Sequence, residues 1–261
     1  MFATAFSNRF LILRLVQREL ALKYAGSILG AVWSVLTPLL MLLIYTLFFS
    51  VVIKAKWGGA GFESESFALL LFTGLLVHMF FSEVMVGAPN LIVNNANYVK
   101  DGISNRSPRH RSNTDSIRRP FGKCFLLIIF VTVSKGLPSA TAFFAIPILA
   151  PLFVVALGTS WVLSALGVYF RDISQISGLI ASVLLFASPV FYPVSALPEK
   201  YQIFLYLNPL TFIIEQLRVV ILTDGLPNFT VLSLYWVAAL LFCGGSFYCV
   251  KRLKSGFADV L

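Results

Sequence analysis

The sequence has few charged residues for its length, and this scarcity limits the class of protein. Of 261 residues, 12% are charged and 58% are hydrophobic, with a mean hydropathy of +0.87. This composition excludes a water-soluble domain. It predicts an all-α integral membrane protein, formed by residues 1–261 as one transmembrane domain, whose fold is set by the number of its apolar spans.

Side chains that hold metals, disulfides or nucleotides are equally scarce. Cys124, Cys243 and Cys249 show no paired spacing, and His78 and His110 are isolated, so the residues predict no metal site. No GxxxxGK[ST] loop occurs, and the chain therefore has no motif that cradles a nucleotide phosphate. We expect a transport subunit rather than an enzyme, with no catalytic residues and no cofactor bound by this chain.

Positive charge is present, but it is not distributed as on a nucleic-acid-binding surface. The net charge of +9 comes from basic residues that lie between apolar stretches. Basic loops of this kind report the orientation of a membrane protein. We therefore expect membrane lipids, and no nucleic acid, among its contacts.

Apolar stretches with the length or composition of membrane spans occur at five places, 28–52, 67–86, 141–170, 173–186 and 232–250. A further apolar run, 124–133, has about half of the ~20 residues that a helical span needs. If a full crossing exists there, the protein has six transmembrane helices. Both termini are then cytoplasmic and most Lys and Arg lie on the cytoplasmic side, although Arg218 is an exception.

The stretch 188–222 is too broken by proline to cross a membrane whole and too apolar to be an ordinary aqueous loop. Its prolines are Pro189, Pro193, Pro198 and Pro209. Irregular backbone is tolerated at membrane depth where protein or a water-filled cavity covers it. We interpret the stretch as a re-entrant periplasmic hairpin of two short helices between spans five and six. The alternative is two amphipathic helices on the membrane surface.

The first residues predict an amphipathic helix at the cytoplasmic interface, over residues 8–25. Arg14 and Arg18 share one face, whereas Leu13, Val16 and Leu20 lie on the opposite one. The basic face suits lipid headgroups or a protein partner, and simple membrane anchoring is the competing explanation.

Residues 101–123 form an atypical polar and basic segment. The segment reads DGISNRSPRHRSNTDSIRRPFGK and directly precedes the short apolar run. A disordered basic loop is one interpretation. If the reading frame is shifted forward by one base inside the codon of residue 101, however, degenerate codons permit MVFPIEVL followed by a long apolar run. Our hypothesis is that two compensating insertions or deletions, in the gene or in its sequencing, altered the start of the third transmembrane helix. We then expect this copy to be inactive.

The chain resembles the permeases of the ABC-2 type that export O-antigen, capsule and teichoic-acid chains. The resemblance lies in six blocks, RELALKYAGSILGAVWSVLTP at 18–38, LFTGLLVHMFFS at 71–82, NANYVK at 95–100, GVYFRDIS at 167–174, SPVFYP at 188–193 and LNPLT at 207–211. His78 stands where such proteins often have Trp. Residues 101–123 replace a start of the third helix that resembles Lys-Val-x-Phe-Pro.

The resemblance implies a homodimeric channel for lipid-linked polysaccharide across the bacterial inner membrane. Two separate ATPase subunits, which bind ATP and magnesium, would dock beneath it. The docking residues implied are Arg14, Arg18, Asn97, Lys100, Arg171 and Asp172. The four prolines of 188–222 would form the periplasmic gate.

Aromatic side chains are candidates for the channel lining, because sugar rings rest their C–H faces on aromatic rings. Our candidates are Trp33, Tyr45, Phe80, Phe186, Phe191 and Tyr192. Each could instead face lipid, pack in the interior or belong to an interfacial aromatic belt.

Two other classes of function compete with the exporter. A secondary transporter would need intramembrane acids and related halves, whereas Glu83 and Glu215 lie near span ends and no internal repeat is evident. A membrane-embedded glycosyl or acyl transferase would need His, Asp or Glu clustered at one membrane face. The two histidines are far apart in the sequence, and no acidic pair stands out.

Overall fold

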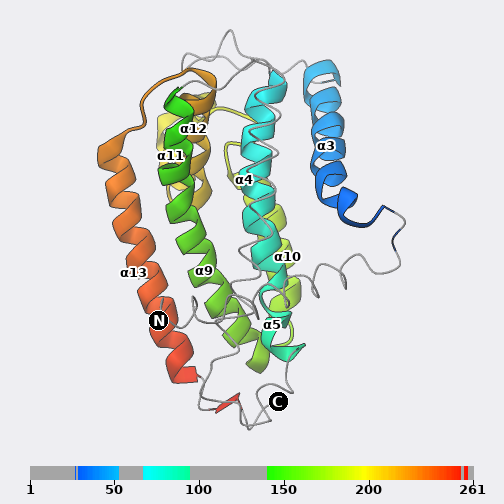
Figure 1. Cartoon of the computed structure of the whole chain (residues 1–261), viewed down its shortest axis with the longest axis vertical. Coiled ribbons are helices and arrows are strands. Elements are labelled where there is room, and N and C mark those ends of the chain that lie inside the picture. The colour runs from blue at the N-terminus through cyan, green and yellow to red at the C-terminus, as the bar shows by residue number, and fades with distance from the viewer. Residues whose placement is uncertain (1–26, 28, 53–66, 95–139, 254–255, 258–261) are drawn as a thin grey trace.

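The computed structural model describes residues 27, 29–52, 67–94, 140–253 and 256–257, and no strand occurs among them. The all-α prediction is confirmed for this part of the chain (Figure 1). Its elements are the helices η1 Gly30–Val32, α3 Trp33–Thr46, η2 Leu47–Val52, α4 Phe67–Gly87, α5 Asn90–Val93, η3 Ala140–Phe144, α9 Ala145–Tyr169, α10 Ile173–Ala187, η4 Val194–Ala196, α11 Glu199–Tyr206, α12 Pro209–Leu222 and α13 Phe229–Leu253.

Helices occupy all five predicted apolar stretches. Three helical segments, 67–87, 141–169 and 229–253, are long and apolar enough to cross a bilayer, among the residues that the structure describes. The apolar helices Val35–Ser50 and Ile173–Ala187 are shorter. The expected interface helix at 8–25, the polar segment 101–123 and the apolar run 124–133 all lie outside the described residues.

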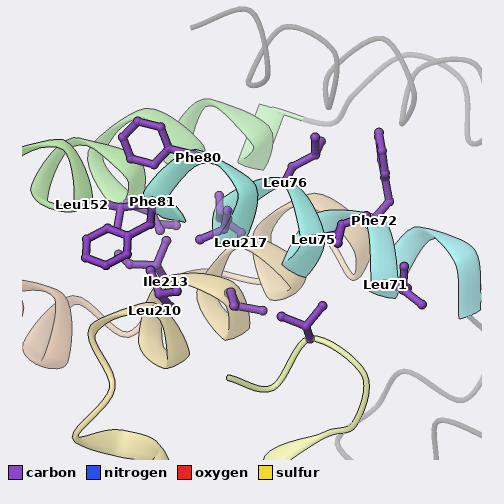
Figure 2. Close-up of a cluster of buried hydrophobic side chains, with 14 of the residues drawn as sticks. Leu71, Phe72, Leu75, Leu76, Phe80, Phe81, Leu152, Leu210, Ile213 and Leu217 are labelled. Carbon is purple, nitrogen blue, oxygen red and sulfur yellow. The ribbon is translucent and has the colours of Figure 1, made fainter. Parts of the chain in front are cut away.

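Helix α4 is the centre of the bundle. Fourteen of its 21 residues are buried, on every side of the helix, as expected of a helix that is apolar all round. It packs against α3, α9, α10 and α12. Figure 2 shows Leu75 and Phe81 of α4 close to Leu217 and Ile213 of α12. Two segments that lie far apart in the sequence, α4 and α12, are therefore in direct contact within this core.

A second, smaller apolar cluster lies at the other end of the bundle. It joins α5, α9, α13 and the short segment after α13 through the buried side chains of Ile92, Trp161, Val250 and Phe257. The hydroxyl of Tyr169 donates a hydrogen bond to the carbonyl oxygen of Leu253, at 2.8 Å. This cluster ties the start of the Arg171–Asp172 turn to the end of α13.

Helices α4 and α9 run in the same direction. Near the start of α9, Thr141 donates to the carbonyl oxygen of Val220 on α12, and Leu70 near the start of α4 also contacts α12. At the opposite ends, Gly167 of α9 lies against the backbone of Pro89, just after α4. Residues 94 and 140 therefore lie at opposite ends of the bundle (Figure 1).

Candidate functional site

The segment 188–222 folds as two short helices that meet at a sharp bend. Helices α11 and α12 are inclined to each other by 99°, which confirms the prediction of two helices. All four prolines lie at helix boundaries. Pro189 follows the end of α10, Pro193 and Pro198 precede η4 and α11, and Pro209 is the first residue of α12. Because proline fixes its own φ and restricts the residue before it, these positions set where each helix starts and stops.

Asn208 holds the bend closed. Its side-chain oxygen accepts from the N–H of Leu210, at 2.9 Å, and so caps α12. Its amide nitrogen donates to the carbonyl oxygen of Ala187, at 3.1 Å, and to the hydroxyl of Ser188, at 2.8 Å. One buried side chain thus joins the start of α12 to the end of α10.

The buried hydroxyl of Thr211 adds a second bond across the bend, because it donates to the carbonyl oxygen of Leu205, at 2.6 Å. From the last span, the hydroxyl of Tyr235 donates to the carbonyl oxygen of Pro209, at 2.8 Å. Backbone bonds across the bend, such as that from the N–H of Asn208 to the carbonyl oxygen of Leu205, and these side-chain bonds together satisfy its backbone groups, as backbone away from water requires.

Arg218 of α12 is the largest fully buried side chain that the structure describes, with 2% of its surface exposed. Its Nε and Nη2 donate to the carbonyl oxygen of Leu70, at 3.0 and 2.9 Å. Its Nη1 donates to the carbonyl oxygen of Pro189, at 2.7 Å, and Nη2 also donates to that of Val190, at 3.2 Å. The guanidinium group therefore joins α12, α4 and the turn after α10.

Gly74 makes room for this arrangement. A Cβ atom at this position would lie 2.9 Å from Arg218 Nη2 and 3.1 Å from the Cα of Val190. Both distances are closer than ordinary van der Waals contact. The glycine within the 71–82 block is therefore explained by close approach of the guanidinium group and the turn to α4.

Three of the six candidate channel aromatics come together around Phe191. The Phe191 ring lies 5.0 Å from Tyr45 and 5.8 Å from Phe186, and it stacks on Phe49 at 4.6 Å. Phe191 is buried and Phe186 is exposed. This group, which we call the Phe191 cluster (Tyr45, Phe49, Phe186 and Phe191), joins α3, α10 and the proline-rich turn.

The other three candidate aromatics are not among the stacked rings of this cluster. Trp33 is exposed at the start of α3. Phe80 is buried in the core against Phe153, with ring centroids 4.9 Å apart. Tyr192 is half-buried and donates to the carbonyl oxygen of Phe186, at 2.7 Å. A role in channel lining stays a prediction for all six residues.

Of the predicted ATPase-docking residues, the structure describes two. Arg171 and Asp172 form an exposed turn between α9 and α10, at the end of the bundle opposite α11 and α12. The side chains of Lys251 and Arg252 are exposed at the end of α13, near the same end. Arg14, Arg18, Asn97 and Lys100 lie outside the described residues, so a shared docking surface stays a prediction.

Sequence reasoning missed the roles of Arg218 and Asn208. The signal for Arg218 was present, because it is the one basic residue of the apolar helix α12, but we treated it as an exception to the orientation rule. His78 was treated as isolated, whereas its Nε2 lies 3.0 Å from the carbonyl oxygen of Ala181 and 3.0 Å from the hydroxyl of Ser82. No group of three metal-ligating side chains occurs within the described ranges.

Helices with this length and composition, together with a bent helix pair between the last two apolar helices, α10 and α13, define a multi-pass membrane protein. Residues 11–222 match the model of the ABC-2 type transporter family, and the chain belongs to this family.

Curated relatives match between 77% and 96% of the chain. The chain is 26% identical over 254 residues to the O-antigen export system permease protein RfbA of Klebsiella pneumoniae, which covers 96% of this chain and 95% of that protein. It is 27% identical over 228 residues to RfbA of Myxococcus xanthus, covering 85% and 84%. It is 22% identical over 208 residues to the polysialic acid transport protein KpsM of Escherichia coli, covering 77% of each.

Proposed function

We propose that this chain is the permease subunit of an ATP-driven exporter that moves lipid-linked polysaccharide across the bacterial inner membrane. The observation that carries the proposal is the full-length similarity to permeases named for O-antigen export. A relative named for polysialic acid transport supports the broader substrate class, a long acidic or neutral glycan. Two copies form the channel, and two copies of a separate ATPase supply the energy.

The proposed topology has six crossings, with the α11–α12 pair on the periplasmic side. The common direction of α4 and α9 supports it, because the described chain stops at residue 94 at one end of the bundle and resumes at residue 140 at the other. Exposed Arg171, Lys251 and Arg252 lie toward the end away from α11 and α12. Basic residues favour the cytoplasmic side, and this end is therefore assigned to the cytoplasm.

In this topology the segment 188–222 is the gate, and the conformational change of the ATPase reaches the permease through the Arg171–Asp172 turn. The gate is held by side chains rather than by a continuous helix, so it can move as a unit about its prolines. We expect the polar segment 101–123 to insert poorly, so that the crossing between residues 94 and 140 forms efficiently only when the frame of that segment is shifted. The activity belongs to the version of the chain in which the frame of that segment is shifted.

The test uses the full chain in both versions, each coexpressed with the ATPase subunit of an O-antigen export system. We expect the frame-shifted version to copurify with the ATPase, to raise its ATP turnover and to restore surface glycan in a permease-deficient strain. The version as written fails in the complementation assay. If neither version binds an ATPase or restores glycan, the exporter assignment is wrong.

A further inference from the structure

One cation holds three separate parts of the bundle together. Four hydrogen bonds of Arg218 end on main-chain carbonyl oxygens, one on α4 and two on the turn after α10. The two carbonyls of the turn, those of Pro189 and Val190, lie outside helices, so helical bonding does not satisfy them. Arg218 therefore supplies donors where the polypeptide leaves acceptors open.

The geometry requires arginine. A guanidinium group offers five N–H donors in one plane, which lets it bond acceptors on two sides at once, whereas a lysine ammonium is a single point with three donors. The space is shaped for this group as well, because Gly74 leaves out the Cβ atom that would meet Nη2.

The chemistry of the acceptors makes the attachment reversible. Carbonyl oxygens are dipoles, and water can replace the guanidinium on them at little enthalpic cost when a wet passage opens. Glu215, one turn earlier on α12, is half-buried and interacts electrostatically with Arg218, so an acidic group of the same helix stays beside the cation when its bonds to the carbonyl oxygens are exchanged.

Helix α11 itself buries little of its surface against the bundle. Helix α11 exposes Tyr201, Ile203, Phe204 and Tyr206, and only Leu205 of its residues is buried. The hairpin is therefore fastened through α12, where Arg218 lies among fully buried apolar neighbours such as Ile214 and Leu217.

We propose that Arg218 reversibly fastens the α11–α12 hairpin to α4 in a closed state, and that Gly74 leaves the space that its guanidinium group needs. We call this contact the Arg218 latch. The proposal rests on the proposed function, because it assigns a positioning residue to the gate of the same exporter. Opening exchanges the four bonds for water, and closing restores them.

The test measures opening directly, in the full chain with the shifted frame at 101–123, without ATPase or glycan. Cys124, Cys243 and Cys249 are replaced by Ser, and a single reporter is introduced by Val190→Cys, a position that is fully buried. A membrane-impermeant maleimide then reports access from the periplasmic side. A second reporter, Ser164→Cys, is buried in α9 away from Arg218 and reports global unfolding.

We expect Arg218→Gln to raise the labelling rate at position 190 by about tenfold or more, as the loss of charged hydrogen bonds implies, with position 164 still protected. Arg218→Lys, which keeps the charge, raises the rate in the same direction. Gly74→Ala does so without any change in charge, whereas Gly87→Ala on the same helix, whose Cβ would meet open space, leaves the rate unchanged.

Equal protection of position 190 in Arg218→Gln, Gly74→Ala and the parent would overturn the latch. Parallel labelling of positions 190 and 164 would also overturn it, because Arg218 would then support the whole fold rather than one movable part. Because the test uses neither ATPase nor glycan, its result can be interpreted even if the exporter assignment is wrong.

Discussion

Arg218 and Leu70, 148 positions apart in the sequence, are joined by two hydrogen bonds from one guanidinium group to one carbonyl oxygen. The contact connects the helix after the bend with the helix at the centre of the bundle. Any movement of the α11–α12 hairpin away from α4 has to break this contact.

The subunit alone should be inert toward ATP. It has no GxxxxGK[ST] loop to cradle a phosphate. We expect vesicles that contain only this protein to show no ATP hydrolysis and no glycan movement. The control is the same preparation with an added ATPase subunit. ATP turnover in a sample shown by mass spectrometry to be free of ATPase subunits would refute the assignment.

Arg171→Glu should uncouple the permease from its ATPase. The residue lies on an exposed tight turn, and a reversed charge there opposes whatever acidic groups the partner presents. We expect loss of most ATPase stimulation with unchanged expression. Lys200→Glu is the matched control, since Lys200 is exposed on α11 in the hairpin. Full coupling in the frame-shifted protein with Arg171→Glu would contradict a docking role for this turn.

The hairpin should protect its residues from labelling in an alternating pattern. In single-cysteine variants across 191–210, we expect protection at the buried positions 191, 194, 205 and 208 and labelling at exposed positions such as 195, 201 and 204. Uniform labelling would show an aqueous loop and end the hairpin assignment.

Pro193→Ala and Pro209→Ala should change leak or transport more than membrane insertion. Both prolines lie at helix boundaries, where they set the bend without contributing apolar length. Leak is measured by dye efflux from vesicles, and insertion by the yield of membrane-integrated protein. If both variants insert poorly, and vesicles that contain the inserted fraction show no dye efflux, the prolines serve folding rather than gating.

Gly167→Ala should destabilise the junction between α5 and α9. A Cβ atom at this position would overlap the carbonyl group of Pro89, so the two backbones would have to separate. Overpacking of this kind costs about 1–3 kcal/mol. Gly178→Ala is the control, because its Cβ meets open space and alanine favours a helix by up to about 1 kcal/mol. Thermal unfolding in detergent compares them, and equal midpoints would mean that α5 moves away freely.

The segment 101–123 should prevent a third crossing in the sequence as written. It contains Arg106, Arg109, Arg111, Arg118, Arg119 and Lys123. A charge at a helix centre costs about 2.5–3.5 kcal/mol on insertion scales, against about −0.3 to −0.6 kcal/mol for an apolar residue. Several central charges together would exceed what the short run 124–133 can offset, so the segment should stay in the cytoplasm.

Reporter fusions placed after Lys135 test this prediction. A cytoplasmic signal is expected from the sequence as written, and a periplasmic signal from the version with the shifted frame. An efficient periplasmic signal from the sequence as written would refute the insertion argument. Coding DNA whose shifted frame contains a stop codon or a polar run would refute the frameshift hypothesis.

The sequence was sufficient for the helices, because length and apolar content decide where a membrane helix forms. The predicted stretch 67–86 and helix α4 differ by a single residue at one end. The bend at Asn208 and Pro209 was also predictable, since a proline after a polar residue is a strong helix start.

The contacts that hold the bend were not predictable from local patterns. Arg218 bonds carbonyl oxygens, which every residue carries, so no side-chain motif marks its partners. The need for glycine at position 74 likewise depends on Arg218, 144 positions later. Only the packing of the helices determines where that side chain points. For the same reason, the sequence made Phe80 and Tyr45 equal candidates for the channel lining, whereas the structure buries Phe80 in the core and places Tyr45 against Phe191 of the proline-rich turn.

The burial of α4 on every side has a consequence for biogenesis. This helix leaves the ribosome before α9, α10 and α12, the partners that will later surround it. Lipid tails are as apolar as leucine, so a helix without a polar stripe can remain stable in the bilayer until those partners arrive. The apolar surface that forms the core of the finished protein is thus also what lets the early helix persist alone, and the assembly can form around it in the order in which the chain is made.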